Sequence, residues 1–179
     1  MDMNDSREIA AEPEVVWAAL LDPEVLKACI PGCTEMTGSP EAGYEATVVQ
    51  KVGPVKASFR GAIRVEDIEE GRAVTLAGEG KGGPAGFAKG EARVTLEPSG
   101  AGTLLTYAAS AKVGGKLAQL GGRVIDGVAR RMADDFFARF QEAVEGPAEA
   151  EAAAPLEATP EGEAPQGAAR KGWFRRRAT

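Results

Sequence analysis

Histidine is absent from this chain of 179 residues, and cysteine occurs only twice, as Cys29 and Cys33. Without histidine the chain has no imidazole general base and no Ser-His or Cys-His pair, and most zinc and iron sites lose their commonest ligand. The spacing of the two cysteines suits neither a Cys-x-x-Cys redox pair nor a disulfide scaffold. We interpret both as small buried apolar side chains of a protein in a reducing compartment.

Long hydrophobic runs are also absent. The longest, from Val15 to Leu21, is far shorter than the roughly 20 residues that cross a bilayer. The first ten residues carry four charges and lack the apolar segment of a secretory signal. We therefore expect a cytoplasmic protein. The formal net charge of −6 argues against nucleic acid as a partner.

Two C-terminal segments each carry charges of one sign only: residues 146–169 have no bases, and residues 170–179 have no acids. Residues 146–169 are rich in Ala, Pro, Glu and Gly and contain five acids but no Lys or Arg. Their only large apolar residue is Leu156, so burial cannot offset the entropy of ordering them, which predicts a disordered linker. Residues 170–179 contain no acid. We expect a globular domain at 1–145, this linker, and a basic aromatic tip at 170–179.

The tip combines five bases with two aromatic side chains, a composition that suits the inner face of the cell membrane. At about 1 kcal/mol per base near an anionic surface, the bases supply about 5 kcal/mol of reversible, salt-sensitive binding. A solubilising tail, RNA binding and docking to an acidic protein are the alternatives. The candidate membrane-binding residues are Arg170, Lys171, Trp173, Phe174, Arg175, Arg176 and Arg177.

Two short helices followed by strands are predicted within residues 1–145. Pro13 before an apolar run, and Asp22 as an N-cap before Pro23, are typical helix starts, and Pro31-Gly32 suits a turn. Alternation of apolar and polar residues then predicts antiparallel strands between Gly- and Pro-containing turns, most clearly at 44–51, 56–66, 73–78, 88–96 and 103–113.

One long amphipathic helix is predicted from Leu117 to a stop at Gly146-Pro147. Gly121, Gly122 and Gly127 weaken it, and we expect them to allow close approach of the sheet or of a ligand. An antiparallel sheet of about seven strands, curled around this helix and with two short helices after its first strand, is an α+β fold. The apolar stripe of the helix is Leu117, Leu120, Val124, Val128, Met132, Phe136, Phe140 and Val144.

Small residues on the inward face of the predicted sheet either let the sheet and helix pack tightly or leave an apolar cavity, and we favour the cavity. These residues are Ala57, Gly61, Gly90, Ala92, Ala109 and Ala111. Tyr107 is the expected hydrogen-bond partner of a ligand carbonyl. The candidate ligand-binding residues are Trp17, Val48, Phe59, Ile63, Val65, Leu76, Leu105, Tyr107, Leu117, Leu120, Val124, Val128 and Met132.

Three segments resemble the CoxG family of carbon monoxide dehydrogenase proteins, which belongs to the START-type helix-grip superfamily, also called SRPBCC. They are PEVVWAALLDPEVLKACIPGC (13–33), KVGPVKASFRG (51–61) and GGKLAQLGGRVIDGVARRMADDFF (114–137). The resemblance implies a helix-grip fold and a non-enzymatic protein that accompanies a molybdenum hydroxylase of the carbon monoxide dehydrogenase type. Such an enzyme passes electrons to the respiratory chain. The expected link is an apolar isoprenoid quinone, menaquinone or ubiquinone, held in the cavity.

Three functions are compatible with these residues: a quinone or lipid carrier, a membrane recruitment or assembly factor for the hydroxylase, and an enzyme like the polyketide cyclases of the superfamily. The enzyme has the least support, because no pair of carboxylates is arranged for acid–base work. Residues 78–83, GEGKGG, match a dinucleotide-binding pattern, but Pro84 and a further strand follow where a helix is needed. We assign no catalytic residue and no metal ligand.

Overall fold

A computed structural model of the chain describes residues 1–153, and describes side chains for residues 1–146. Met1–Gly146 form one compact unit. The membrane-binding residues predicted at 170–179, and the linker from residue 154 onward, lie outside the described residues and stay predictions.

The two short helices begin where the sequence predicts. Strand β1 (Asp2–Ile9) leads into α1 (Pro13–Leu20) and α2 (Pro23–Cys29), and each helix has proline in its first turn. Asp22 caps α2 by accepting a hydrogen bond from the Glu24 backbone N–H at 2.8 Å. The chain then turns at Gly32, whose φ of +79° is easily adopted only by glycine.

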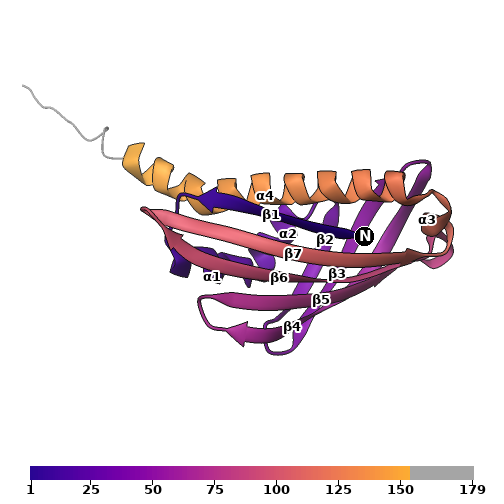
Figure 1. Ribbon diagram of the computed structural model, residues 1–179, viewed down its shortest axis with the longest axis horizontal. Helices are drawn as coiled ribbons and strands as arrows, with labels where there is room; N and C mark the ends of the chain where they lie inside the picture. The colour runs from indigo at the N-terminus through magenta and orange to yellow at the C-terminus, as the bar shows by residue number, and fades with distance from the viewer. Residues whose placement is uncertain (154–179) are drawn as a thin grey trace, which may run out of the picture. The chain divides into compact units, whose positions relative to one another are not determined.

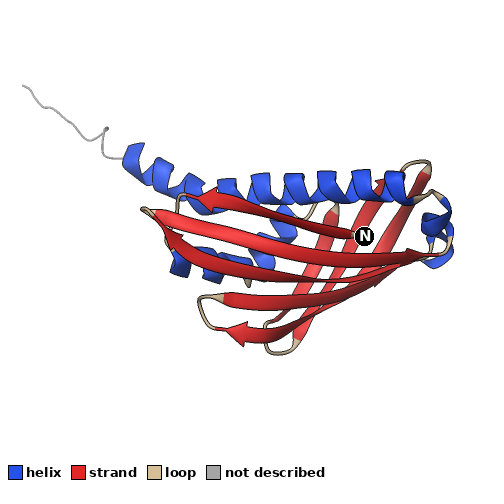
Figure 2. Cartoon of the chain, viewed as in Figure 1, coloured by secondary structure: helices blue, strands red, loops and turns tan. Residues whose placement is uncertain are grey.

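Seven antiparallel strands form one sheet in the order β1-β7-β6-β5-β4-β3-β2 (Figures 1 and 2). Six consecutive strands make a meander, and β1 joins it beside β7. The predicted antiparallel α+β architecture is confirmed. The strands after β1 are β2 (Cys33–Ser39), β3 (Gly43–Val52), β4 (Val55–Glu69), β5 (Ala73–Lys81), β6 (Phe87–Ser99) and β7 (Gly102–Gly114).

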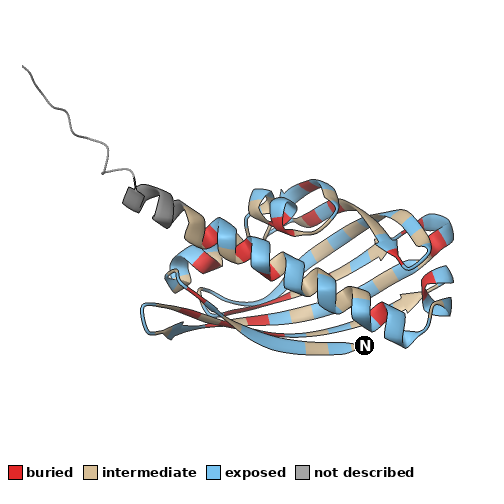
Figure 3. Cartoon of the chain, turned by 90° about the horizontal axis from the view of Figure 1, so that it is seen from above, coloured by how far each residue is buried: buried red, intermediate tan, exposed pale blue. Residues whose placement is uncertain are grey.

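The helix α4 (Gly122–Ala153) crosses the sheet diagonally (Figure 3). Phe137, Phe140 and Val144 from this helix join α1 and four strands in the main core, whose fully buried members include Val16 and Leu105. This core occupies the end of the sheet nearest α1. A smaller cluster around Val52, Leu117 and Ile125 lies at the opposite end, so the two ends of α4 rest on separate groups of side chains.

The predicted continuous helix from Leu117 is wrong at its beginning. A separate short helix, α3 (Lys116–Gln119), precedes α4, because the chain turns at Gly121 with a φ of +89°. At the start of α4 the buried face runs through Ile125 rather than Val124, which is 39% exposed, while Phe140 and Val144 are buried as the predicted stripe requires. A strict four-residue spacing drifts around a helix of 3.6 residues per turn, which explains the difference. The expectation of close approach at the helix glycines is also wrong, since a Cβ at Gly121, Gly122 or Gly127 meets nothing within 4 Å.

The predicted stop at Gly146-Pro147 is also wrong, because α4 continues to Ala153. The residues after Pro147 are Ala and Glu, which are strong helix formers. The first eight residues of the predicted 146–169 linker are therefore helical.

Candidate ligand-binding site

Two apolar cavities lie between α4 and the inner face of the sheet. The first, of about 390 Å³, is next to the main core and is bounded by α2, β5 to β7 and the middle of α4; we call it the core-side chamber. The second, of about 300 Å³, lies toward the β3–β4 hairpin and the start of α4; we call it the hairpin-side chamber. Ile30 and Ala111 line both, so the chambers are neighbours.

The space exists because small residues face each other across neighbouring strands. Gly78 pairs with Gly90 between β5 and β6, and Ala92 pairs with Ala109 between β6 and β7. All four line the core-side chamber. With no side chain beyond Cβ, they leave a gap under α4 that a row of valines or leucines would fill.

Four of the six small residues expected at a cavity lie there: Gly90, Ala92, Ala109 and Ala111 line the chambers. The other two do not. Ala57 lines an open pocket at the end of β4, and Gly61 lines a separate groove beside β2 and β3.

The chambers bring together most of the candidate ligand-binding residues. Ile63, Leu76 and Tyr107 line the core-side chamber. The hairpin-side chamber is lined by the remaining members of this group, namely Val48, Phe59, Leu117, Val128 and Met132. Their contact with a ligand stays a prediction.

Five other candidates do not line either chamber. Leu105 has no exposed surface and belongs to the main core, against which Trp17 and Val65 also pack. Leu120 packs at the helix break against the cluster around Leu117. Val124 is exposed, because it lies about 160° around the helix from the buried Phe140 at 3.6 residues per turn.

Several lining residues were not predicted, although the alternation or periodicity of the sequence indicates most of them. Gln50 lies between Val48 and Val52 on β3, at an inward-facing position of the strand alternation. Ile125 and Phe137 each lie one position after a residue of the predicted stripe. Both residues lie within α4, so their burial follows from the 3.6-residue period of that helix.

The polar groups of the site are few. The ring of Tyr107 stacks on Phe137 with centroids 4.9 Å apart, and its hydroxyl makes no hydrogen bond within the described residues but keeps some access to solvent. Burial, with the nearby Asp5 carboxylate, raises the pKa of Tyr107. Tyr107 lines the core-side chamber, and its raised pKa favours the neutral hydroxyl as a hydrogen-bond donor. The Gln50 side-chain amide donates instead to the Pro31 carbonyl.

An ion-pair cluster links β1 to α4. Arg7 Nη2 lies 2.7 Å from Asp134 Oδ1 and 3.3 Å from Asp5 Oδ2. The Arg7 guanidinium also lies 5.4 Å from the centroid of the Phe137 ring. The cluster joins the edge strand to the helix beside Tyr107, which is directly opposite Asp5 in the sheet.

The other candidate sites have no support in the described residues. No group of three or more His, Cys, Asp or Glu among them is placed to hold a metal ion. Residues 78–81 belong to β5, and the helix after them spans three residues, so no phosphate-binding helix start follows the glycines. Cys29 is fully buried as expected, whereas Cys33 is half-buried and its thiol donates to the Glu35 carbonyl. Burial raises the pKa of both thiols.

Within residues 1–153, no helix is both long enough and apolar enough to cross a membrane.

Comparison with solved structures identifies the architecture. A conserved protein from Geobacillus kaustophilus is 36% identical with a TM-score of 0.76, over 82% of this chain and 96% of its own. Proteins from Chromobacterium violaceum and Thermus thermophilus are 17% and 16% identical, both with TM-scores of 0.61. They match 81% and 82% of this chain and 98% and 99% of their own. The fold is the helix-grip fold that the resemblance implied.

Sequence comparison gives the family. No protein of curated function matches the chain. The sequence profile of CoxG, a subunit of carbon monoxide dehydrogenase, matches residues 6–145, which include every strand from β2 to β7 and both chambers' helix face. The chain therefore belongs to the CoxG family of carbon monoxide dehydrogenase proteins.

Proposed function

We propose that this protein is a non-enzymatic carrier that binds an isoprenoid respiratory quinone, menaquinone or ubiquinone, between α4 and the sheet. The observation that carries the proposal is the pair of adjoining apolar chambers, with Tyr107, whose hydroxyl makes no hydrogen bond within the described residues, in the wall of one of them. Binding sites for apolar small molecules have this composition and volumes of about 300–1,000 Å³.

The two chambers suit the two parts of such a quinone. A ring carbonyl accepts a hydrogen bond from the Tyr107 hydroxyl in the core-side chamber, where the Phe136 and Phe137 rings supply flat apolar contacts. The isoprenoid chain has no polar atoms and fills the hairpin-side chamber. The shared walls at Ile30 and Ala111 place the two spaces next to each other, as one elongated molecule requires.

The partner follows from the family. Its name links its members to carbon monoxide dehydrogenase, a molybdenum hydroxylase whose electrons must reach the respiratory chain. A carrier that lifts a quinone out of the bilayer brings the electron acceptor to the enzyme. The helix-grip domain supplies an apolar cavity for that cargo.

The basic aromatic tip at 170–179 anchors the carrier reversibly to the inner face of the membrane in this proposal. Removing these residues removes five bases, each worth about 1 kcal/mol near an anionic surface. We expect partition onto phosphatidylglycerol vesicles to fall by between about three and four orders of magnitude. Sedimentation with vesicles measures this. Unchanged partition would exclude the tip as the anchor.

Identification of the bound molecule tests the cargo. The full-length protein is purified from its native host without detergent, extracted with organic solvent, and analysed by mass spectrometry. A near-stoichiometric isoprenoid quinone is the expected result and names the quinone. A different lipid would overturn the quinone and point to lipid transfer.

An empty extract, together with failure to reload quinone, would favour a second function. The protein would then be a recruitment or assembly factor that holds the hydroxylase at the membrane without moving a ligand. The composition of the tip supports this function as well as the first. The chambers favour the carrier.

A further inference from the structure

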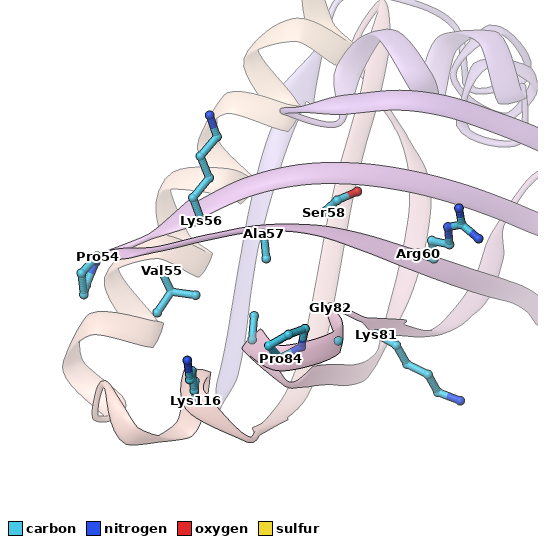
Figure 4. A pocket seen from close by; sticks show the side chains of 12 residues that line it. Pro54, Val55, Lys56, Ala57, Ser58, Arg60, Lys81, Gly82, Pro84 and Lys116 are labelled. Carbon is cyan, nitrogen blue, oxygen red and sulfur yellow. The ribbon is translucent and has the colours of Figure 1, made fainter.

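An open pocket of about 770 Å³ lies at the end of the sheet near the β3–β4 hairpin (Figure 4). It exists because β4 pairs with β5 only as far as Arg60, opposite Lys81. The residues of β4 before this pair leave a gap toward Gly82–Ala85 and the start of α3. Val55 and Ala57 form one side of the gap, and Pro84 and Lys116 the other.

Four cations surround this pocket, and no acidic residue of the described chain lines it; we call Lys56, Arg60, Lys81 and Lys116 the basic mouth. Lys81 lies 3.7 Å from Glu79, while no salt bridge joins the other three to a described residue. The C-terminal segment 146–179 has five acids and five bases, so the rest of the chain carries the whole net charge of −6. A cationic end on so acidic a domain indicates an anionic partner.

The strand register strengthens this argument. Lys51 lies directly opposite Lys56 between β3 and β4, and Arg60 directly opposite Lys81 between β4 and β5. Like charges directly opposite each other destabilise a sheet. The fold therefore keeps two unfavourable pairs side by side at its cavity end, which folding alone does not require.

Exposed apolar side chains flank the basic mouth. Phe87, 48% exposed, is directly opposite Lys81 in the sheet. Val124 is also exposed, and a Cβ on Gly53 in the β3–β4 hairpin would lie 3.7 Å from it. Cations beside exposed apolar groups are the combination that binds the interface of an anionic bilayer.

A single aromatic ring separates this surface from the hairpin-side chamber. Phe59 lines the chamber, and its ring is so close to Gly82 that a Cβ there would clash with it. Gly82 itself lines the pocket at the basic mouth. An apolar molecule that passes the Phe59 ring moves from the basic mouth into the hairpin-side chamber.

We propose that the basic mouth docks the folded domain directly on an anionic lipid surface, as a second membrane contact separate from the tip, with the hairpin-side chamber facing the bilayer. The role as a loading position rests on the proposed carrier function. The contact with the membrane does not. Each cation neutralised should weaken partition by about fivefold, the ratio that corresponds to 1 kcal/mol.

The test uses full-length chains in which Arg170, Lys171, Arg175, Arg176 and Arg177 are changed to Gln. In this background, Lys56→Gln with Lys116→Gln is compared with Arg72→Gln plus Arg131→Gln. The second pair is exposed, is in no described salt bridge, and lies at the β4–β5 turn and on α4. Partition onto phosphatidylcholine vesicles with and without phosphatidylglycerol is measured by sedimentation.

We expect the tip-neutralised chain to bind only vesicles that contain phosphatidylglycerol. The variant that also carries Lys56→Gln and Lys116→Gln should partition onto these vesicles about 25-fold more weakly. The control pair should bind as the background does, and circular dichroism should show equal folding. Equal losses in both pairs, binding without phosphatidylglycerol, or no binding by the tip-neutralised chain would each overturn the proposal.

Titration of the unmodified chain with a short-chain quinone in solution separates this proposal from the carrier function. Failure to bind quinone, with vesicle binding that still depends on the mouth, would remove the cargo and leave the docking surface in place. Quinone binding without mouth-dependent docking would overturn the docking surface and leave the carrier function in place.

Discussion

The two tyrosines of this chain are both buried, yet their hydroxyls differ in what they bind. Tyr44 donates to the Leu21 carbonyl at 2.5 Å and so joins β3 to the turn between the first two helices. Tyr107 stacks on Phe137 with its hydroxyl free of described partners. The Tyr107 hydroxyl is not among the fully buried unpaired polar atoms of the described residues, so it is open to a water molecule or to a ligand.

Replacement of Tyr107 by Phe separates these roles. The ring packing is kept, so we expect the free energy of unfolding to change little. Quinone affinity should fall by up to about tenfold, the loss of one neutral hydrogen bond of about 0.5–1.5 kcal/mol. Tyr44→Phe is the matched control, which should lower stability by about 1 kcal/mol and leave affinity unchanged. Fluorescence titration and urea unfolding measure both, and equal affinities for the two variants would contradict the role of Tyr107.

Single residues also show how far sequence reasoning reaches. Val48 and Ile63 were correctly placed on the inner face, because strand alternation assigns faces locally. Val124 was misplaced because the predicted stripe kept a strict four-residue spacing, which drifts around a helix of 3.6 residues per turn. Leu105 was placed on the correct face but belongs to the core, since alternation does not tell where along a strand the helix touches it.

At the scale of the element, the 3.6-residue period of α4 decides which residues face the chambers. Gly121 separates α3 from α4, and within α4 Ile125, Val128 and Met132 line the hairpin-side chamber. Apolar periodicity predicted the existence and direction of the long helix, because many turns of amphipathic sequence dominate one local error. The periodicity did not predict where the helix begins and ends, because the glycine and proline near its two ends are compatible with either a stop or a continuation.

One substitution tests this helix face. Val128→Trp places an indole in the hairpin-side chamber, so ligand uptake should fall at least tenfold while the free cavity volume limits the loss of stability to about 1–3 kcal/mol. Val124→Trp, one turn earlier on the exposed side, is the control and should bind quinone normally. Unchanged uptake by Val128→Trp would mean that the ligand lies elsewhere.

At the scale of the whole molecule, the fold was predictable because every element carried its own signal. Caps marked the short helices, alternation marked the strands, and turn residues separated them. The cavity was harder to predict, because the small residues Gly90, Ala92 and Ala109 are compatible with either close packing or empty space. Only the distance between α4 and the sheet distinguishes these, and that distance is set by the bulky side chains at the two ends of the helix.

The response to alkali is a property of the whole domain. Burial raises the pKa of Cys29 above its ordinary 9.0, and those of Tyr44 and Tyr107 above 10.0. The neutral forms are thus favoured in the folded chain, and this stabilisation is complete below the ordinary values and lost as pH rises through the raised ones. We expect the free energy of unfolding to fall from about pH 9 upward. Urea unfolding followed by circular dichroism measures it, and Tyr44→Phe with Tyr107→Phe should flatten the decline above pH 10; a curve that the double variant leaves unchanged would assign the decline to other groups.

The pairing of β1 with β7 has a consequence for how the chain reaches this structure. Asp2 pairs with Ser110 and Ile9 with Thr103, so β1, the first strand to be synthesised, cannot pair until β7, the last strand, has been made. Non-local pairing of this kind slows folding to the range of milliseconds to seconds. Meanwhile the waiting strand is a free edge, and its charges at Asp2, Asp5, Arg7 and Glu8 oppose pairing with a neighbouring chain on the ribosome. The charged residues of β1 thus also protect the newly made protein from aggregation.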